Sequence, residues 1–356
     1  MKSISSVIPL LLLLGILFLS CDIETPDLSN PYVINGNKSL VNAITPEADG
    51  GFNIMAFSSY GNIVLAGAAH SFLYLSENGG EDWYTVNGLE KQEYWTGVGV
   101  SENGEYLYVA GQDLYISSDS GKTWRVYDYG EGYDGDANIQ LSNDGSTLLT
   151  MGVHRVDEVN FSTDYGYTWT DKILGGGNLD SIGVSSNGRI MAALTYSGPL
   201  WLSSNSGALW NEISLENRQW EDMALSADGE HIVIAEFGGL IDPLSPGISY
   251  SEDSGTTWEY NTITALSRIT DVCIFDDGDI IIASGNLIDE PIVISDDQGE
   301  SWTQIDKPET ENPSGWPEYE IFYSETGTDI WALEKGYSLW HSTDGGSSWT
   351  KELQGN

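Results

Sequence analysis

The chain has few basic residues and is strongly acidic. Its 356 residues include 13 Lys and Arg against 54 Asp and Glu, so the formal net charge is −41. Nucleic acids and anionic membrane surfaces are bound through Lys and Arg side chains, and this composition therefore excludes nucleic acid as a partner. The acidic residues occur in nearly every predicted loop, which favours a solvated acidic coat over one cation-attracting patch.

Cysteine is nearly absent, and so are the common signatures of catalytic and metal sites. The only two cysteines are Cys21 and Cys273. Cys273 lies in the apolar run 272–275, where we expect a small buried hydrophobic residue, so no disulfide is predicted. The sequence has no metal-ligand spacing, no phosphate-binding glycine loop and no Ser/His/Asp arrangement. It therefore predicts neither a metal nor a cofactor.

The N-terminus predicts an export signal. Met1-Lys2 is followed by the apolar run 7–19, and Ser20 precedes Cys21. A run of this length is typical of a signal peptide rather than of a spanning helix. The segment resembles a bacterial lipoprotein signal, with Phe18 where leucine is usual. That resemblance implies cleavage before Cys21 and a firm, multiply acylated anchor on an extracytoplasmic protein; the alternative is ordinary secretion with Cys21 incidental.

An eight-residue motif, Ser-x-Asp-x-Gly-x-Thr-Trp, occurs seven times and is called the box below. Its Ser, Gly and Trp are present in every copy, and the tryptophans follow one another every 41 to 48 residues. The copies are 76–83, 117–124, 162–169, 203–210, 251–258, 295–302 and 342–349. A fixed period in this range indicates a repeat architecture.

The residue types of the box predict a hairpin turn. A short apolar run ends at the Ser and another begins at the Trp. An Asp side chain accepts hydrogen bonds from backbone N–H groups two residues on, and Gly supplies a positive φ. Six turns of the form Ser-x-x-Gly each precede a box within its unit, and each is flanked by apolar runs. Four short strands per unit, A to D, repeated seven times predict an all-β, single seven-bladed β-propeller with four-stranded antiparallel blades.

This motif resembles the Asp-box, or BNR, repeat, found in sialidases, xyloglucanases, sortilin-type receptor domains and photosystem II assembly factors. The resemblance covers about residues 54–353 and implies the propeller fold, but it does not choose between enzymes and binding proteins. We predict a lipoprotein signal peptide at 1–20, an acylated cysteine and tether at 21–45, and the propeller at 46–356. The tether could add a strand at 32–34 or 40–44, and the mode of ring closure stays open.

The strand directions divide the ring into two faces. Boxes and Ser-x-x-Gly turns share one face, here called the box face. The D-to-A and B-to-C connections form the opposite loop face, where binding is expected. Three tryptophans fall in its D-to-A connections, each near carboxylates, and Tyr319 adds a ring; the tryptophans are Trp95, Trp220 and Trp316. Such rings suit a carbohydrate or peptide ligand. The alternative is that each ring packs its own loop onto a neighbouring blade.

Three acidic residues precede strand A at the same repeat position, namely Asp222, Asp271 and Glu320. Asn138 and Ser181 hold this position in two other units. The shared register places the acids near the mouth of the central channel. A ring of carboxylates there could hold a hydrated cation; the alternative is simple solvation at the rim.

Arginines allow a test of enzymatic function. Arg155, Arg218 and Arg268 fall on the loop face. Sialidases with this repeat bind the substrate carboxylate with three arginines. They use an Asp as the acid/base and a Tyr–Glu pair as the nucleophile. This chain lacks their Arg-Ile-Pro motif, and those enzymes are six-bladed. It also lacks the arginine-rich patch of the photosystem assembly factors, because it has five arginines in all.

The sequence thus favours a lipid-anchored, monomeric cell-envelope propeller that is a non-enzymatic binding or assembly module. Its ligand, a protein or a carbohydrate, is expected on the face opposite the boxes. The alternative function is a glycoside hydrolase of sialidase type with a diverged site. Convergence of the three arginines in one pocket would favour the enzyme.

Overall fold

The computed structural model of the chain describes residues 34–35, 38–41, 52–58, 61–68, 72–86, 89, 95–128, 138–152, 155–215, 218–236, 246–275, 278–285, 287, 289–309, 319–323, 330–335 and 337–354. The predicted signal peptide, Cys21 and Trp316 lie outside these residues. Within the described part of the chain there are strands and turns but no helix, and hence none long and apolar enough to cross a membrane.

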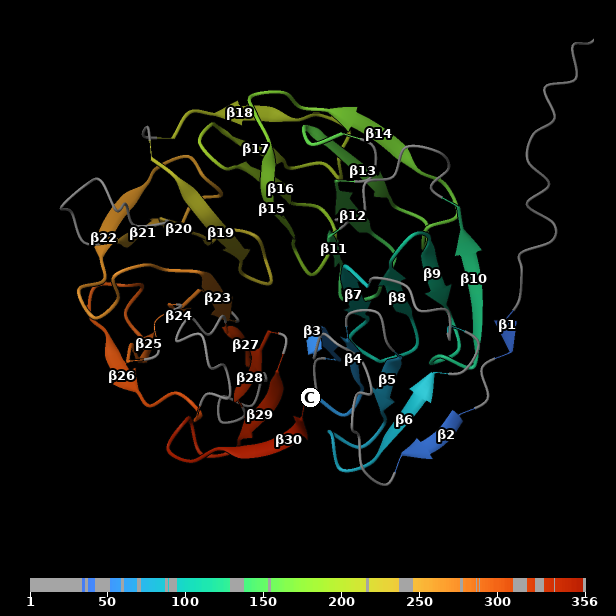
Figure 1. The fold of residues 1–356 in the computed structure, drawn as a ribbon. Coiled ribbons are helices and arrows are strands. Elements are labelled where there is room, and N and C mark those ends of the chain that lie inside the picture. The colour runs from blue at the N-terminus through green and yellow to red at the C-terminus, as the bar shows by residue number, and fades with distance from the viewer. Residues whose placement is uncertain are drawn as a thin grey trace, which may run out of the picture. The chain divides into compact units, whose positions relative to one another are not determined.

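Seven antiparallel sheets form a ring, which confirms the predicted propeller (Figure 1). Each sheet is one blade, and its strands run in sequence order from the channel outward. Blades 1 to 3 contain β3 (Phe52–Phe57), β4 (Val64–Ala68), β5 (Leu73–Ser76), β6 (Trp83–Val86); β7 (Gly97–Val100), β8 (Leu107–Ala110), β9 (Leu114–Ser117), β10 (Thr123–Tyr127); and β11 (Asn138–Leu141), β12 (Leu148–Met151), β13 (Glu158–Ser162), β14 (Thr170–Ile173).

Blades 4 to 7 repeat the same four-stranded plan. They contain β15 (Leu179–Val184), β16 (Met191–Thr195), β17 (Leu200–Ser203), β18 (Asn211–Ile213); β19 (Trp220–Leu225), β20 (Ile232–Glu236), β21 (Gly247–Ser251), β22 (Glu259–Thr262); β23 (Asp271–Phe275), β24 (Ile280–Ser284), β25 (Ile292–Ser295), β26 (Thr303–Ile305); and β27 (Tyr319–Tyr323), β28 (Ile330–Glu334), β29 (Ser338–Ser342), β30 (Thr350–Gln354). Hydrophobic clusters lie between adjacent blades, as in the cluster shared by blades 4 and 5, so no blade buries its faces alone.

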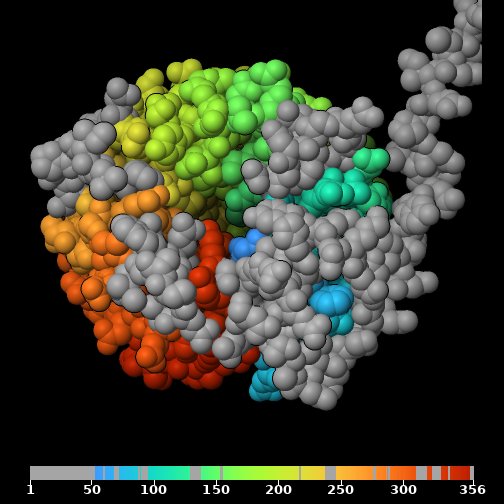
Figure 2. Space-filling view, in the orientation of Figure 1, coloured from blue at the N-terminus to red at the C-terminus, as the bar shows by residue number. Residues whose placement is uncertain are grey.

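The ring closes without exchange of a strand. Blade 7 is complete within residues 319–354, and β28 lies against β3 of blade 1. The space-filling view shows blue atoms of blade 1 beside red atoms of blade 7 (Figure 2). Two short outer strands lie in the segment where the sequence predicted a tether with one possible added strand: β2 (Lys38–Val41) pairs with β6, and β1 (Ile34–Asn35) pairs with β10. The sheets therefore begin before residue 46, where the sequence placed the start of the propeller.

Each box is a closed network of hydrogen bonds. In the second copy Gly121 N donates to Ser117 Oγ at 2.8 Å, and Thr123 N donates to Asp119 Oδ1 at 2.8 Å. The Gly-to-Ser hydrogen bond recurs in all seven copies. Gly121 has a φ of +80°, a conformation that disfavours any residue with a Cβ. The box therefore satisfies its own backbone, as its residue types predict.

The boxes adjoin the Ser-x-x-Gly turns of their own blades. Ser120 N donates to Glu105 O at 3.0 Å, and Ser206 N donates to Arg189 O at 2.9 Å. Neighbouring turns are linked in the same way, since Asn143 N donates to Ser186 O at 2.9 Å. These bonds confirm that boxes and turns share one face, and they leave the longer connections for the other.

Candidate functional site

A cavity of about 550 Å³ lies in the channel, lined by the inner strands of blades 1, 2, 3, 6 and 7. Its lining includes residues of the box-face turns, such as Ser58 and Asn143, and residues nearer the loop face, such as Thr96 and Lys335. The cavity therefore runs along the channel and is not confined to the loop-face rim, where the sequence placed the ligand.

Small residues create this cavity. At the second position before each turn, most inner strands carry a small side chain or none; the seven residues are Ala56, Gly99, Gln140, Gly183, Ala224, Cys273 and Phe322. A Cβ on Gly99 would lie 2.2 Å from Leu141 Cδ2 of the next blade, and one on Gly183 would lie 2.4 Å from Leu225 Cδ1. A side chain at either glycine would therefore displace a leucine of the next blade. Phe322 is the largest residue in this layer.

A second layer lies two residues earlier, on the same side of the strands. We call it the seven-residue ring; its members are Ile54, Gly97, Asn138, Ser181, Asp222, Asp271 and Glu320. Each pairs with the equivalent position of the second strand in its blade. The predicted common register of the three acids is therefore present, with polar residues on blades 3 and 4 and apolar positions on blades 1 and 2.

Two of these acids bridge neighbouring blades. Asp222 Oδ2 accepts a hydrogen bond from Val272 N of blade 6 at 3.0 Å, and Asp271 Oδ2 accepts one from Ile321 N of blade 7 at 3.0 Å. Ser181 Oγ donates to Asp222 Oδ1 at 3.0 Å. An inner edge strand otherwise leaves such N–H groups unpaired. These carboxylates therefore support the ring structurally.

Burial raises the pKa of each acid in this region. It raises the pKa of Glu320 to about 7, where Lys335 opposes the effect and Asp222 adds to it. Burial and the charges of Glu221 and Asp222 also raise the pKa of Asp180 to about 7.

The pKa values of the two bridging acids are also raised. The pKa of Asp271 is raised well above its ordinary value by burial and by the nearby charges of Asp222 and Glu320. The pKa of Asp222 is raised by burial although hydrogen bonds oppose it. Within the described residues, no three acidic, His or Cys side chains form a group that could hold a metal ion.

The aromatic candidates do not face solvent. Trp95 is 0% exposed and packs edge-on against Tyr115 at 5.7 Å between ring centroids. Trp220 is 1% exposed in the cluster between blades 4 and 5. Tyr319 is also buried, and its hydroxyl donates to Pro308 O at 3.3 Å. The expectation of exposed rings is therefore corrected for these three, because each ring fills space between or beside blades; Trp316 lies outside the described residues.

The three arginine candidates each have a separate carboxylate partner. Arg155 pairs with Asp157, two residues away, at 2.9 Å. Arg218 Nη1 lies 2.9 Å from Glu236 Oε2, and its guanidinium stacks over the Tyr260 ring at 3.9 Å.

Arg268 Nη2 lies 3.0 Å from Glu221 Oε1. None of the three arginines lines the central cavity. The structure therefore does not bring them together in this pocket as a sialidase-type site requires.

Sequence reasoning missed the apolar wall of the cavity. Phe57 and Phe322 lie 5.2 Å apart between ring centroids, and Phe57 lies 5.2 Å from Trp331. All three line the cavity. The signal was present in the repeats, because Phe322 is a large residue at a position where five of the other six blades carry Ala, Gly or Cys. It becomes visible only when the seven inner strands are compared position by position.

Comparison with known proteins supports the fold and not a family. No protein-family model matches the chain. Among curated proteins, the vacuolar protein sorting/targeting protein 10 of Chaetomium globosum is 30% identical over 82 residues. That match covers 22% of this chain and 5% of that protein, so the chain spans only a small part of the relative.

Two solved structures have a similar fold over nearly their whole length. YCF48 bound to D1 peptide aligns with a TM-score of 0.60 and 14% identity, covering 87% of this chain and 97% of that one. YCF48 from Cyanidioschyzon merolae aligns with a TM-score of 0.60 and 14% identity, covering 86% and 98%. At this identity the likeness shows the fold alone.

Proposed function

We propose that this chain is a non-enzymatic binding module of the cell envelope whose partner is a protein. The central cavity carries the proposal: it has about 550 Å³ of space, and its lining combines an apolar wall with polar and charged side chains such as Asn138, Glu320 and Lys335, as binding sites commonly do. The separate pairing of Arg155, Arg218 and Arg268 argues against the sialidase-type alternative. Trp95, Trp220 and Tyr319 are buried, so these three rings do not offer a contact surface to a ligand.

A protein partner is also supported by the fold comparison. YCF48, which has the similar propeller, has been solved with a D1 peptide. We place the partner on the loop face, because the box face is occupied by short turns that bond to one another. The long connections of the loop face are where such a scaffold carries its binding residues.

Site-specific photo-crosslinking in cells that produce the chain tests this proposal. Benzoylphenylalanine is placed at Thr264, an exposed residue between blades 5 and 6 on the loop face, or at Thr256, an exposed residue of a box. We expect a defined protein adduct from position 264 and none from position 256. Adducts of equal yield from both positions, or none from position 264, would contradict the proposed face.

We further propose that Cys21 anchors the protein in the membrane. The support is the apolar run 7–19 directly before Ser20 and Cys21. Since several acyl chains hold a protein firmly, Cys21→Ser is expected to move most of the protein from the membrane fraction to the soluble fraction. Immunoblots of the two fractions measure this, with Cys273→Ser as the matched control. Equal membrane retention of Cys21→Ser would show that Cys21 is not the anchor.

A further inference from the structure

Glu320 is the acid of the seven-residue ring whose carboxylate accepts no hydrogen bond from the described residues of a neighbouring blade. Asp222 and Asp271 each accept a hydrogen bond from a backbone N–H group of the following blade. The donor is the residue that comes directly after that blade's member of the seven-residue ring. The blade that follows Glu320 is blade 1, where Ile54 holds the ring position. Among the described residues none donates a hydrogen bond to Glu320, so the series of inter-blade bonds stops at the ring closure.

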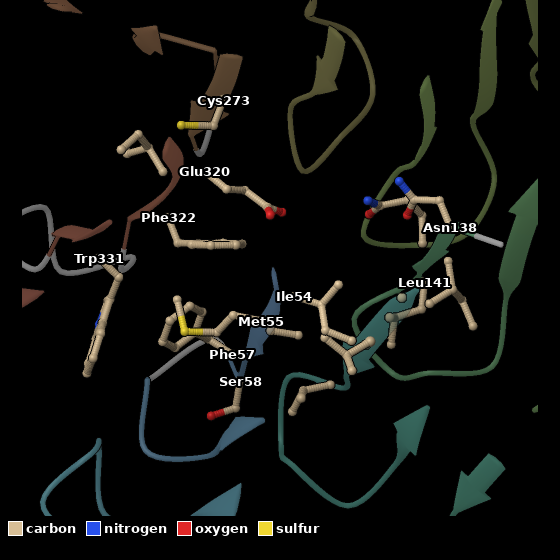
Figure 3. A pocket seen from close by; sticks show the side chains of 18 of the residues that line it. Ile54, Met55, Phe57, Ser58, Asn138, Leu141, Cys273, Glu320, Phe322 and Trp331 are labelled. Atoms are coloured by element: carbon tan, nitrogen blue, oxygen red, sulfur yellow. The ribbon is translucent and has the colours of Figure 1, made fainter. Parts of the chain in front are cut away.

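The Glu320 side chain is enclosed and directed into the cavity. Figure 3 shows its carboxylate pointing into the open centre, with Asn138 on the opposite wall. The residue is half-buried and lines this space. A buried carboxylate without donors is costly, and that cost is reflected in its pKa of about 7. Such a group is most stable as a carboxylate when a cation lies beside it.

The surroundings of Glu320 are apolar. Phe322 lies two residues along β27, on the same side of the strand. Phe322 packs against Phe57, and both line the cavity together with Ile54. Lys335 also lines the cavity and lowers the pKa of Glu320, but burial outweighs this effect, so Lys335 alone does not offset the cost of the buried carboxylate. A hydrocarbon stem could lie along the apolar wall while its charged end reaches the carboxylate, as Lys and Arg side chains do at protein surfaces.

We propose that the cavity receives a basic side chain of the protein partner, a lysine or an arginine, with its charged end at Glu320. This inference rests on the proposed protein-binding function and names the chemistry of the partner. A metal ion fits less well, because Asp222 and Asp271 are committed to backbone N–H groups and do not line the cavity. An anionic ligand would meet a carboxylate in a chain of net charge −41.

The test is a ligand-observed NMR titration of the full chain in detergent with Nα-acetyl-lysine amide. The neutral analogue Nα-acetyl-norleucine amide has a similar stem without the ammonium group. Glu320→Gln removes the charge and keeps the shape. Glu300→Gln removes a charge from an exposed position outside the lining of the cavity and is the matched control. Thermal unfolding of each variant confirms that it is folded.

We expect the lysine probe to bind the parent chain and the norleucine probe to bind much more weakly. Glu320→Gln should weaken binding of the lysine probe by about tenfold or more, because a charged hydrogen bond is lost. Glu300→Gln should change it less than about twofold, because solvent and salt screen an exposed charge far from the cavity.

Equal binding of both probes, no binding of either, or unchanged binding to Glu320→Gln would overturn the inference. So would a calcium chloride titration whose effect disappears in Glu320→Gln, because it would assign the carboxylate to a metal. None of these results decides the photo-crosslinking test, which examines independently whether the chain has a protein partner.

Discussion

Replacing Trp220 with alanine is expected to lower the free energy of unfolding by about 3–5 kcal/mol, as removal of a large buried aromatic side chain does. The ring is 1% exposed and packs among Leu194, Leu202 and Met223 between blades 4 and 5. Its backbone N also donates to Tyr196 O of blade 4 at 2.8 Å. Urea unfolding followed by tryptophan fluorescence or circular dichroism measures the loss.

Two controls separate packing from ligand contact. Trp220→Phe keeps most of the buried area and removes an indole N–H that finds no hydrogen-bond partner among the described residues, so it should cost far less than alanine. Leu209→Ala changes a side chain that is 59% exposed and should stay within about 0.5 kcal/mol. A Trp220→Ala variant as stable as the parent, but with reduced crosslinking to the partner, would contradict the packing role and restore the ring as a contact residue.

The fold was predictable because each repeat contains the residue types that its own hairpin turn requires. Ser117, Asp119 and Gly121 stand where a hairpin turn needs an acceptor, a second acceptor and a positive φ, and the structure places them in those roles. Repetition then fixes the number of blades. The outer strands at 34–35 and 38–41 were less predictable, because their pairing with β10 and β6 depends on backbone edges that leave no pattern in the sequence.

The candidate site was predictable only in part. Register alone placed Asp222, Asp271 and Glu320 at one level, because equivalent positions of a repeat lie at equivalent places. Register could not show that two of them accept N–H groups of the next blade while the third does not. The roles of Trp95 and Trp220 were also beyond the sequence, since a loop tryptophan beside carboxylates is compatible with either burial or exposure until the neighbouring blade is in place.

Stability is expected to be greatest at mildly acidic pH and to fall as the pH rises toward 8. Two sets of carboxyl groups act in opposite directions. In the boxes, burial alone would raise the pKa of Asp119 and Asp164, but hydrogen bonds outweigh it and hold both pKa values below their ordinary value. Such groups stabilise the fold above the unfolded-state pKa of about 4, and this contribution is lost as the pH falls through the folded-state pKa.

The channel acids behave in the opposite way, because burial raises the pKa of Asp180 and Glu320 to about 7. Between about pH 4 and pH 7 the folded chain binds more protons at these groups than the unfolded chain, so the free energy of unfolding falls as the pH rises. We expect a loss of at least about 2 kcal/mol between pH 5 and pH 8, measured as urea midpoints.

Repulsion among the many carboxylates of this acidic chain also grows with pH. Two pairs of variants, each of which removes two negative charges, separate this repulsion from the titration of the buried acids. Asp180→Asn with Glu320→Gln should flatten the profile above pH 5. Glu81→Gln with Glu300→Gln removes the same charge from exposed positions and should leave the slope nearly unchanged. If both pairs flatten the profile equally, overall repulsion and not the buried carboxyl groups sets the slope; if the parent chain gains stability from pH 5 to pH 8, the raised pKa values of Asp180 and Glu320 are contradicted directly.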